Sequence, residues 1–587
     1  MKSSIQCKKG IPLIHIIVAL ACFGLLPRAQ AVSPPPPGGY PNFTTAAGDH
    51  ALQALTLGVG NTALGTFSLF SVTTGNFNTA VGAGSLDLNT ADSNTATGAA
   101  ALLFNTTGTE NTAVGTAALE FNETGSFNTA NGAFALFSNT GGESNSAFGW
   151  GALELNTTGD HNTATGVGAL FGNTTGIENT ANGANALQTN TTGSDNTATG
   201  VGALFSNTTG FNNTAVGHSA LSSNTDGTEN TAVGEGALFN NTTGSDNTAN
   251  GSEALLLNTT GEGNTAIGAQ ALLANTASFN TAIGQRALSH NTVDGNTAIG
   301  YQTLQLNTAG DSNTAIGTAA LSHNTTAGSN TATGAFALFA NTTGDGSTAD
   351  GGAALASNVD GIRNTAIGWL ALQNNTSGSD NIAIGVGAGS ALTTEAQNLD
   401  IYNNGVAGDL GTIRIGGGLQ TRTFIAGIRG VTTGNNNAVN VVIDSAGQLG
   451  TMSSSRRFKK EIKPMDKASE SILALKPVTF HYKTDKTNTP QFGLIAEEVA
   501  DVDPDLVVRD DNGEIYTVRY DQVNAMLLNE FLKEHRAFVE EQRQVKQQQE
   551  EIDALKTEIK EQRALIEKVN DKMELKASAS QTTANNQ

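Results

Sequence analysis

The chain of 587 residues is acidic, with 52 Asp and Glu residues against 30 Lys and Arg residues and a formal net charge of −22. Such a charge repels nucleic acid and anionic lipid, which excludes them as partners and favours solubility outside the cell. Both cysteines, Cys7 and Cys22, lie in the first 31 residues, so a chain cleaved after Ala31 has no thiol for a disulfide, a zinc site or a nucleophile.

Residues 1–31 have the pattern of a secretory signal peptide. Three lysines within the first nine residues form a basic front, residues 11–26 an apolar core, and Ala29-Gln30-Ala31 a small-residue cleavage site. A membrane anchor is one alternative, but the apolar run is short and four prolines follow it. A lipoprotein site at Cys22 is another, but the apolar run continues past this residue. We therefore expect a protein that is secreted by a bacterial cell or displayed on its surface, with a Pro/Gly-rich linker over residues 32–60.

Residues 61–398 contain twenty copies of one phrase, N-T-A-x-G-x-x-A-L-x-x-N-T-T-G-x-x. The step between copies is 17 residues sixteen times and 16 residues three times. Gly stands at the fifth place in all twenty copies and Leu at the ninth place in nineteen. A strict period gives every copy the same neighbours, which predicts a long β-solenoid of stacked coils.

Each copy reads as a short strand followed by a turn. Asn-Thr-Ala-Val/Ile-Gly is prone to β structure, and Asn-Thr-Thr-Gly is a turn because Asn and Gly tolerate a positive φ. The three short copies lack a residue in this turn, at residues 90–93, 276–279 and 292–295. We expect an interior of Ala and Leu alone and turns that face water. At about 4.8 Å per coil, the coils would form a rod on the order of 95 Å long.

The phrase ends near residue 398. Residues 399–452 contain short apolar or alternating runs, such as Leu399-Asp400-Ile401-Tyr402 and Thr412-Ile413-Arg414-Ile415, between turns rich in Gly and Asn. This pattern predicts a small β neck.

At residue 453 the composition changes sharply. The chain reads Ser453-Ser454-Ser455-Arg456-Arg457-Phe458-Lys459-Lys460, then Gly493-Leu494-Ile495-Ala496-Glu497-Glu498-Val499, then Pro504-Asp505-Leu506-Val507, and later Tyr520. This series of motifs resembles the intramolecular chaperone domain at the C-termini of phage endosialidases and tail fibres. The resemblance implies a small α+β chaperone domain over residues 453–530, which assembles three chains.

The same resemblance implies a site of self-cleavage. In that family a Ser cuts the peptide bond on its own N-terminal side, helped by a Lys five residues later. Carried over, Ser454 is the nucleophile, Lys459 the general base and Ser453–Ser454 the bond that is cut, which makes the chain a Ser/Lys peptidase that acts once on itself. The chemistry requires a neutral Lys, which burial and neighbouring cations favour. Ser455 stands where the family commonly has Asp, and the alternative is a solvated basic strand without cleavage.

Residues 531–576 have the pattern of a coiled-coil helix. One apolar residue recurs every seven positions, at Phe531, Phe538, Val545, Ile552, Ile559, Ile566 and Met573. This is typical of the a position of a heptad, although the d position is apolar only at Leu555 and Val569. A single amphipathic helix that folds back on the chaperone domain is the alternative. The polar residues 577–587 predict a disordered tail.

These parts predict a mainly β protein that works as a homotrimeric fibre. The repeat also resembles, less closely, the heads of YadA-type trimeric autotransporter adhesins, in which N-x-A-I/V-G phrases build stacked coils. We expect the C-terminal domain to drive trimer assembly and to be released by cleavage at Ser453–Ser454.

Two other functions are open. The first is an adhesin or a phage-like receptor-binding fibre that recognises surface glycans or host surfaces, with Trp150 and Trp369 as candidates to stack on sugar rings. The second is an ice-binding solenoid, which the irregular residue at the fourth place of the phrase disfavours. We expect no cofactor, no metal site and no substrate outside the chain, because acidic residues do not recur as pairs and the histidines of the repeat are isolated.

Overall fold

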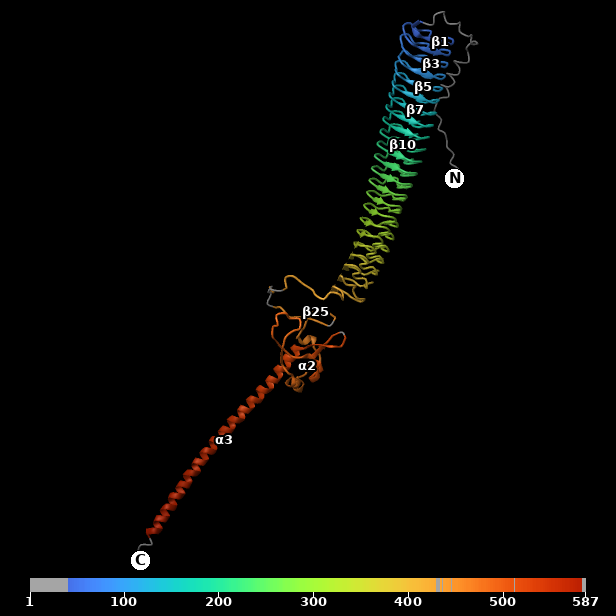
Figure 1. Ribbon diagram of the computed structural model, residues 1–587. Coiled ribbons are helices and arrows are strands. Elements are labelled where there is room, and N and C mark those ends of the chain that lie inside the picture. The colour runs from blue at the N-terminus through green and yellow to red at the C-terminus, as the bar shows by residue number, and fades with distance from the viewer. Residues whose placement is uncertain (1–40, 429–432, 435–436, 445, 511, 583–587) are drawn as a thin grey trace. The chain divides into compact units, whose positions relative to one another are not determined.

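The computed structural model describes residues 41–428, 433–434, 437–444, 446–510 and 512–582. The predicted signal peptide and the first part of the predicted linker lie outside the described residues. The chain divides into two compact units, Met1–Thr423 and Phe424–Gln587 (Figure 1).

The first unit is a β-solenoid in which each coil contributes one three-residue strand. Each strand pairs in parallel with the next along the chain, with like residues opposite each other, as in Thr197 with Thr214 and Ala198 with Ala215. Figure 1 shows these strands stacked one above another. The predicted mainly β fold of stacked 17-residue coils is therefore confirmed.

The turn η1 (Pro41–Phe43) precedes strands β1 (Thr45–Ala47), β2 (Thr62–Leu64), β3 (Thr79–Val81), β4 (Thr95–Thr97), β5 (Thr112–Val114), β6 (Thr129–Asn131), β7 (Ser146–Phe148), β8 (Thr163–Thr165), β9 (Thr180–Asn182), β10 (Thr197–Thr199), β11 (Thr214–Val216), β12 (Thr231–Val233), β13 (Thr248–Asn250), β14 (Thr265–Ile267), β15 (Thr281–Ile283), β16 (Thr297–Ile299), β17 (Thr314–Ile316), β18 (Thr331–Thr333), β19 (Thr348–Asp350), β20 (Thr365–Ile367), β21 (Ile382–Ile384), β22 (Leu399–Ile401) and β23 (Ile413–Ile415).

The ladder of parallel strands extends beyond the twenty copies of the repeat at both ends. Strand β1 lies in the predicted linker and pairs with β2, while β22 and β23 lie in the predicted neck and continue the ladder from β21. Strand pairing uses backbone groups, which every residue except Pro provides in full. Coils whose sequence departs from the repeat can therefore still stack on their neighbours.

The interior contains more than Ala and Leu, so the prediction of an interior of Ala and Leu alone is wrong. The Ala at the third place and the Leu at the ninth are fully buried, as expected, but the Asn residues at the first and twelfth places are buried as well. At a twelfth place, Asn173 Nδ2 donates to Asn156 Oδ1 at 2.7 Å and to Gly176 O at 3.0 Å. Asn173 Oδ1 accepts from Asn190 Nδ2 at 2.8 Å. These Asn columns satisfy turn carbonyls that point into the coil, where an unpaired carbonyl is costly.

The three short coils differ where the sequence places the deletion. In a 17-residue coil, the twelfth-place Asn donates to the carbonyl three residues on, as Asn105 does to Gly108. In the short coils it donates to the carbonyl two residues on, as Asn89 does to Ala91 and Asn275 to Ala277. The missing residue therefore lies between the Asn and the carbonyl that it binds, which confirms the predicted place of the deletion.

Glycine is required in each coil for two different reasons. The fifth-place Gly183 has a φ of +148°, and a Cβ there would lie 2.4 Å from Gly200 O of the next coil. The turn glycine Gly176 has no positive φ, but a Cβ there would lie 2.3 Å from Gly193 O. The tolerance of Asn and Gly for a positive φ, on which the prediction of this turn rested, is therefore not what selects them here. The turn Gly is set by close stacking, and the non-Gly positive φ angles occur elsewhere, as at Leu204 with 52°.

The interior Ala column changes at its C-terminal end. Asp400 of β22 and Arg414 of β23 take the place that Ala383 has in β21. Asp400 is 1% exposed, and neither of its carboxylate oxygens has a hydrogen-bond partner among the described residues. Burial raises the pKa of Asp400 to about 6, and the nearby charge of Asp409 adds to this effect. Arg414 pairs with Asp409 at 2.6 Å, so the column ends in charged groups.

The second unit is a small α+β domain followed by a long helix. Its elements are β24 (Val441–Ile443), β25 (Leu449–Thr451), η2 (Arg456–Phe458), η3 (Asp466–Ala474), β26 (Val478–Phe480), β27 (Gln491–Gly493), α2 (Ala496–Val502), η4 (Pro504–Leu506), β28 (Val507–Arg509), β29 (Ile515–Val518) and α3 (Tyr520–Thr582). The strands form three antiparallel pairs, β24 with β25, β26 with β27 and β28 with β29. The buried apolar core described here is small and consists of Val499, Leu506, Val507, Val518 and Met526.

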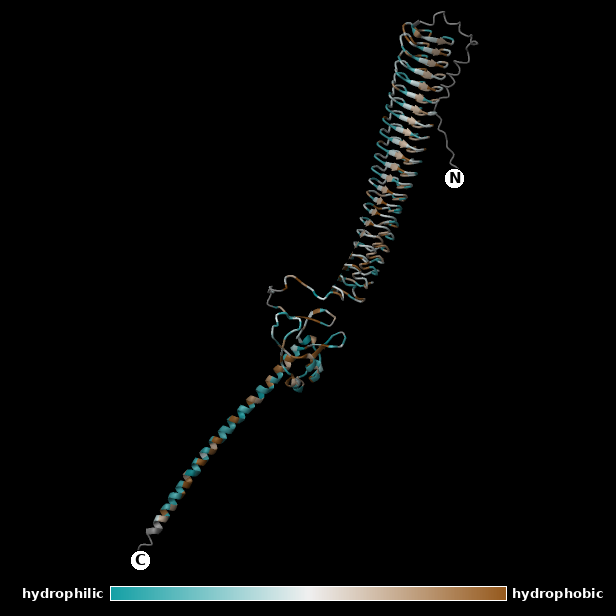
Figure 2. Ribbon diagram, viewed as in Figure 1, coloured by the Kyte–Doolittle hydropathy of each residue, from teal (hydrophilic) through white to brown (hydrophobic). Residues whose placement is uncertain are grey.

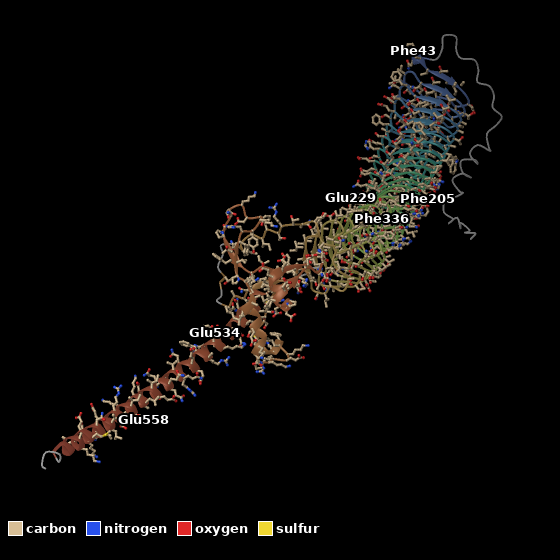
Figure 3. All side chains as sticks on the ribbon, turned by 60° about the horizontal axis from the view of Figure 1, so that its bottom comes forward. Phe43, Phe205, Glu229, Phe336, Glu534 and Glu558 are labelled. Carbon is tan, nitrogen blue, oxygen red and sulfur yellow. The ribbon has the colours of Figure 1, made fainter. Side chains whose placement is uncertain are left out.

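Helix α3 presents its apolar seam to solvent. The heptad residues from Phe531 to Met573 are all exposed, from 46% at Ile552 to 62% at Phe531. Apolar and polar residues alternate along the helix in Figure 2, and acidic side chains such as Glu534 and Glu558 project from it in Figure 3. None of the described helices combines the length and apolar content that a membrane crossing needs.

The helix is longer than the predicted coiled coil. Residues 577–582, which we predicted to be disordered, continue α3, and residues 583–587 lie outside the described part of the chain. The physical reason is that this stretch has no Gly or Pro, and adding a residue to an existing helix is much easier than starting one.

Candidate functional site

The predicted cleavage segment is built around the single turn η2. The Phe458 N–H donates to Ser455 O at 3.0 Å, and the Lys459 N–H donates to Arg456 O at 3.1 Å. Before the turn, the Ser455 N–H lies 3.4 Å from Ser453 Oγ. The predicted nucleophile Ser454 therefore precedes this turn and the predicted base Lys459 follows it.

The environment of these two side chains is open in the single chain. Ser454 and Lys459 are both exposed, and no hydrogen bond joins their side chains among the described residues. The guanidinium of Arg457 lies 4.6 Å from the centre of the Phe458 ring, so the turn is basic and partly covered by its own side chains. A Lys that accepts a proton from a hydroxyl must be shielded from water. One chain alone does not provide this shielding.

Two of the motifs behind the family resemblance meet in space. The Tyr520 hydroxyl accepts a hydrogen bond from the Leu494 N–H at 3.0 Å. It lies so close to Gly493 that a Cβ there would be 2.8 Å from the hydroxyl oxygen. The start of α3 is thus fastened to the end of β27, and this contact explains why Gly and Tyr occur at these places.

The Pro504-Asp505-Leu506-Val507 motif forms a capped turn. Asp503 precedes η4, and its Oδ1 accepts from the Asp505 N–H at 3.1 Å, while its Oδ2 accepts from Ser471 Oγ at 3.1 Å. Pro504 fits the first helical position, where no N–H is needed. Leu506 is buried in the core, and its carbonyl accepts from the Arg519 N–H at 2.8 Å. This motif anchors the core to the start of α3.

Sequence reasoning missed a polar cluster between η3 and α3. Ser469 Oγ is buried, contacts the Glu530 carboxylate and accepts from Asn529 Nδ2 at 2.7 Å. Lys533 Nζ lies 2.6 Å from Glu530 Oε1 and 3.4 Å from Ser469 Oγ. The Glu530 carboxylate raises the pKa of Lys533, which keeps the ammonium protonated. This Ser–Lys contact therefore stabilises the packing of η3 on α3 and is not catalytic, because a protonated Lys cannot act as a base.

The cluster left no signal in the sequence. Ser469 and Glu530 are 61 residues apart and belong to no periodic pattern. Only the fold brings them together.

Together these features define a protein with a β-solenoid in one unit, and in the other a small α+β domain followed by a long helix whose apolar seam is exposed. Residues 454–508 match the family described as chaperone of endosialidase, so the predicted resemblance of the C-terminal domain is confirmed. The match begins at Ser454, the predicted nucleophile, and includes the motifs at residues 493–499 and 504–507. It supports a role of this domain in trimer assembly. No curated protein matches the chain.

Proposed function

We propose that the protein is a homotrimeric fibre, secreted or displayed on the cell surface, whose C-terminal domain assembles three solenoids. The observation that carries the proposal is the chaperone match at residues 454–508, in the domain that leads into α3, a helix with an exposed apolar seam. The domain has a small core of its own, so association of chains would add the burial that it lacks. A coiled coil through the a positions of α3 is the simplest way to cover the seam.

Mass measurement tests the assembly. Native mass spectrometry of the Ser454→Ala variant, which should stay uncut, should give three times the mass of one chain, and a chain that ends at residue 452 should give the monomer or an aggregate. Replacing Ile552 and Ile559 by Glu should abolish the trimer, because both side chains lie on the seam. The matched control Glu561→Gln lies off the seam and should leave the trimer intact. A monomeric full chain, or a trimer that survives truncation, would contradict the proposal.

Self-cleavage at Ser453–Ser454 is the second part of the proposal. Both Ser454 and Lys459 are exposed in one chain, so the shielding that the chemistry needs would come from neighbouring chains in the trimer. This coupling makes cleavage follow assembly. Removal of the nucleator would then leave the fibre kinetically trapped, because refolding would need a domain that is no longer attached.

Intact-mass analysis tests the cleavage. Purified trimer should contain a fragment that ends at Ser453, and Ser454→Ala should contain only the uncleaved chain. The neighbouring Ser455→Ala is the control and should still be cut. An uncut wild-type trimer, or a cut Ser454→Ala variant, would remove the proposed site while leaving the assembly role intact.

Export and adhesion complete the proposal. Residues 1–31 would direct export, and N-terminal sequencing of secreted material should begin at Val32. The exposed rings of Trp150 and Trp369, 51% and 58% exposed, are compatible with a shaft that contacts surface glycans or host surfaces. An ice-binding role is less well supported. The fourth-place residues on the outer face change from Val114 to Asn131 to Phe148, and such a column is not flat.

A further inference from the structure

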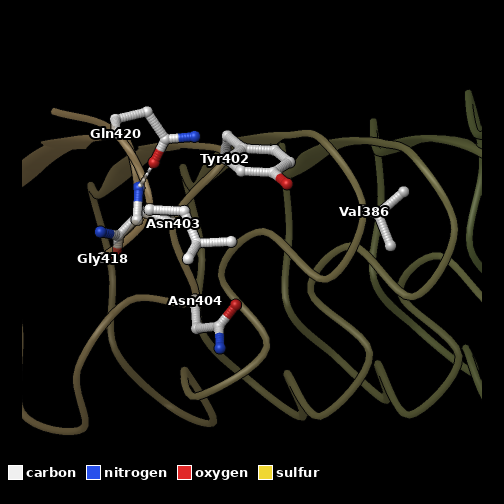
Figure 4. A pocket seen from close by; sticks show the side chains of 8 residues that line it. Val386, Tyr402, Asn403, Asn404, Gly418 and Gln420 are labelled. Atoms are coloured by element: carbon white, nitrogen blue, oxygen red, sulfur yellow. Dashed lines mark hydrogen bonds between the residues drawn. The ribbon is translucent and has the colours of Figure 1, made fainter. Parts of the chain in front are cut away.

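A cavity of about 410 Å³ opens near the C-terminal end of the solenoid, within the first unit (Figure 4). Its lining includes the ring of Tyr402, the side chains of Asn403, Asn404 and Gln420, and the backbone of Gly417. The volume lies at the small end of the roughly 300–1,000 Å³ range of ligand pockets.

Tyr402 occupies the place in the coil where all twenty copies of the repeat have Gly. Its N–H donates to Ile384 O at 2.8 Å, just as the fifth-place Gly385 donates to Ile367 O at 2.7 Å in the coil before. Its φ is 50°, within the range that non-Gly residues adopt in most coils, such as Leu204 with 52°. Tyr402 is 53% exposed, so its side chain is open to solvent at the cavity.

The polar groups around the ring are held in place by the backbone. Asn403 Nδ2 donates to Gly416 O at 2.7 Å, and Asn403 Oδ1 accepts from the Gly405 N–H at 2.8 Å. Gln420 Oε1 accepts from the Gly417 N–H at 2.6 Å, the contact drawn in Figure 4. These bonds fix the last loop of the coil against the ring.

Three polar groups at the cavity remain available to a ligand. Among the described residues, the Tyr402 hydroxyl, the Asn404 amide and Gln420 Nε2 have no hydrogen-bond partner. They offer both donors and acceptors beside an aromatic face. This combination matches a sugar ring, which has an apolar C–H face that stacks on an aromatic ring and hydroxyls that both donate and accept.

The electrostatics restrict the class of sugar. Among the described residues that line the cavity, none carries a charge. The chain as a whole has a net charge of −22, which disfavours an anionic sugar without a cation to receive it. The nearby Arg414 is already paired with Asp409. We propose that this cavity binds one or two neutral sugar units of a glycan, with Tyr402 as the stacking platform and Asn404 and Gln420 as the hydrogen-bonding groups.

Saturation-transfer NMR on the full chain tests the site. The probes are the methyl glycosides of glucose, galactose, mannose and N-acetylglucosamine, with N-acetylneuraminic acid as the charged comparison. At least one neutral probe should receive saturation, strongest at the protons of one ring face, and the charged probe should receive less. Tyr402→Gly should weaken binding by about tenfold or more, since it removes the stacking ring. This variant restores the residue that the repeat itself has at this place, so the coil should fold.

Control variants separate this site from other aromatic surfaces. Tyr301→Ala removes a ring that is 47% exposed on another coil, and it should leave binding unchanged. Asn404→Ala should weaken binding without changing the oligomeric state. The site is overturned if no neutral probe binds, if Tyr402→Gly binds as well as the wild type, or if Tyr301→Ala or Trp369→Ala abolishes binding instead.

The inference rests on the glycan partner proposed above and assigns it a binding site. It does not depend on the proposed role of the C-terminal domain in trimer assembly. Native mass spectrometry of the same samples distinguishes the two. A trimer that binds no neutral sugar overturns the site alone, whereas a monomeric chain overturns the assembly proposal whatever the NMR result.

Discussion

Replacing Asn173 by Ala tests whether the buried amide columns stabilise the solenoid. Asn173 Nδ2 is the donor to Asn156 Oδ1 in the coil before, and Asn173 Oδ1 accepts from Asn190 Nδ2 in the coil after. The variant leaves Asn156 Oδ1 buried without this donor. The Gly176 carbonyl keeps a second donor, Asn162 Nδ2 at 2.8 Å, and so stays paired.

The expected cost follows from these contacts. One buried acceptor without a donor costs about 1–3 kcal/mol, and each of the other lost hydrogen bonds adds about 0.5–1.5 kcal/mol. Asn190 Nδ2 keeps its bond to Gly193 O at 2.9 Å, which limits the damage on that side. We expect a loss of roughly 2–5 kcal/mol in the local opening free energy.

Hydrogen exchange read by mass spectrometry measures this loss coil by coil. Because each coil contacts only its neighbours, protection should fall over residues 156–193 and stay unchanged over residues 314–350. The control Asn182→Ala removes an exposed side chain of β9 and should change protection by less than about 0.5 kcal/mol. Equal effects of the two variants, or a loss spread evenly over the solenoid, would refute the reasoning.

Three further predictions concern glycine stacking, a buried carboxyl and the chaperone domain. Gly183→Ala should lower the thermal midpoint of the solenoid and reduce local exchange protection, because its Cβ would lie 2.4 Å from Gly200 O; an unchanged midpoint and protection would contradict this. Burial raises the pKa of Glu120 from 4.5 to about 7, so its charged form opposes folding: stability is highest below about pH 4.5 and falls as the pH rises to about 7. Glu120→Gln should remove this loss, so that urea midpoints of variant and wild type diverge between pH 5 and 8 and not below. Gly493→Ala should displace the Tyr520 hydroxyl and reduce the yield of trimer in native mass spectrometry, whereas an unchanged yield would show that this contact is dispensable.

The repeat made much of the solenoid predictable. A period of 17 residues fixes which residues lie opposite each other, so burial of Leu at the ninth place follows from the sequence alone. The shortened turns were placed correctly because a deletion is tolerated only where the packed Ala-Leu segment keeps its place. The Asn columns were not predictable from polarity, because the direction of the turn carbonyls decides that residues such as Asn173 point inward.

Other features depend on information that no local pattern contains. The last coils were missed as part of the ladder because Asp400 and Tyr402 replace the Ala and Gly of the phrase, while the backbone pairing continues. The contact of Ser469 with Glu530 joins residues far apart in the sequence. Ser454 and Lys459 were predicted by resemblance, and both side chains are exposed in the single chain.

The charged residues at the end of the interior Ala column also affect whether the solenoid can add further coils. Parallel strands of one sequence can in principle add copies without limit, as amyloid fibrils do. A further Ala-lined coil on β23 would have to enclose Arg414 over the unpaired carboxylate of Asp400, and burying charge in this way is strongly unfavourable. Recruitment of a further coil is thus disfavoured at this end, which favours a solenoid whose length follows the number of encoded copies and does not depend on protein concentration.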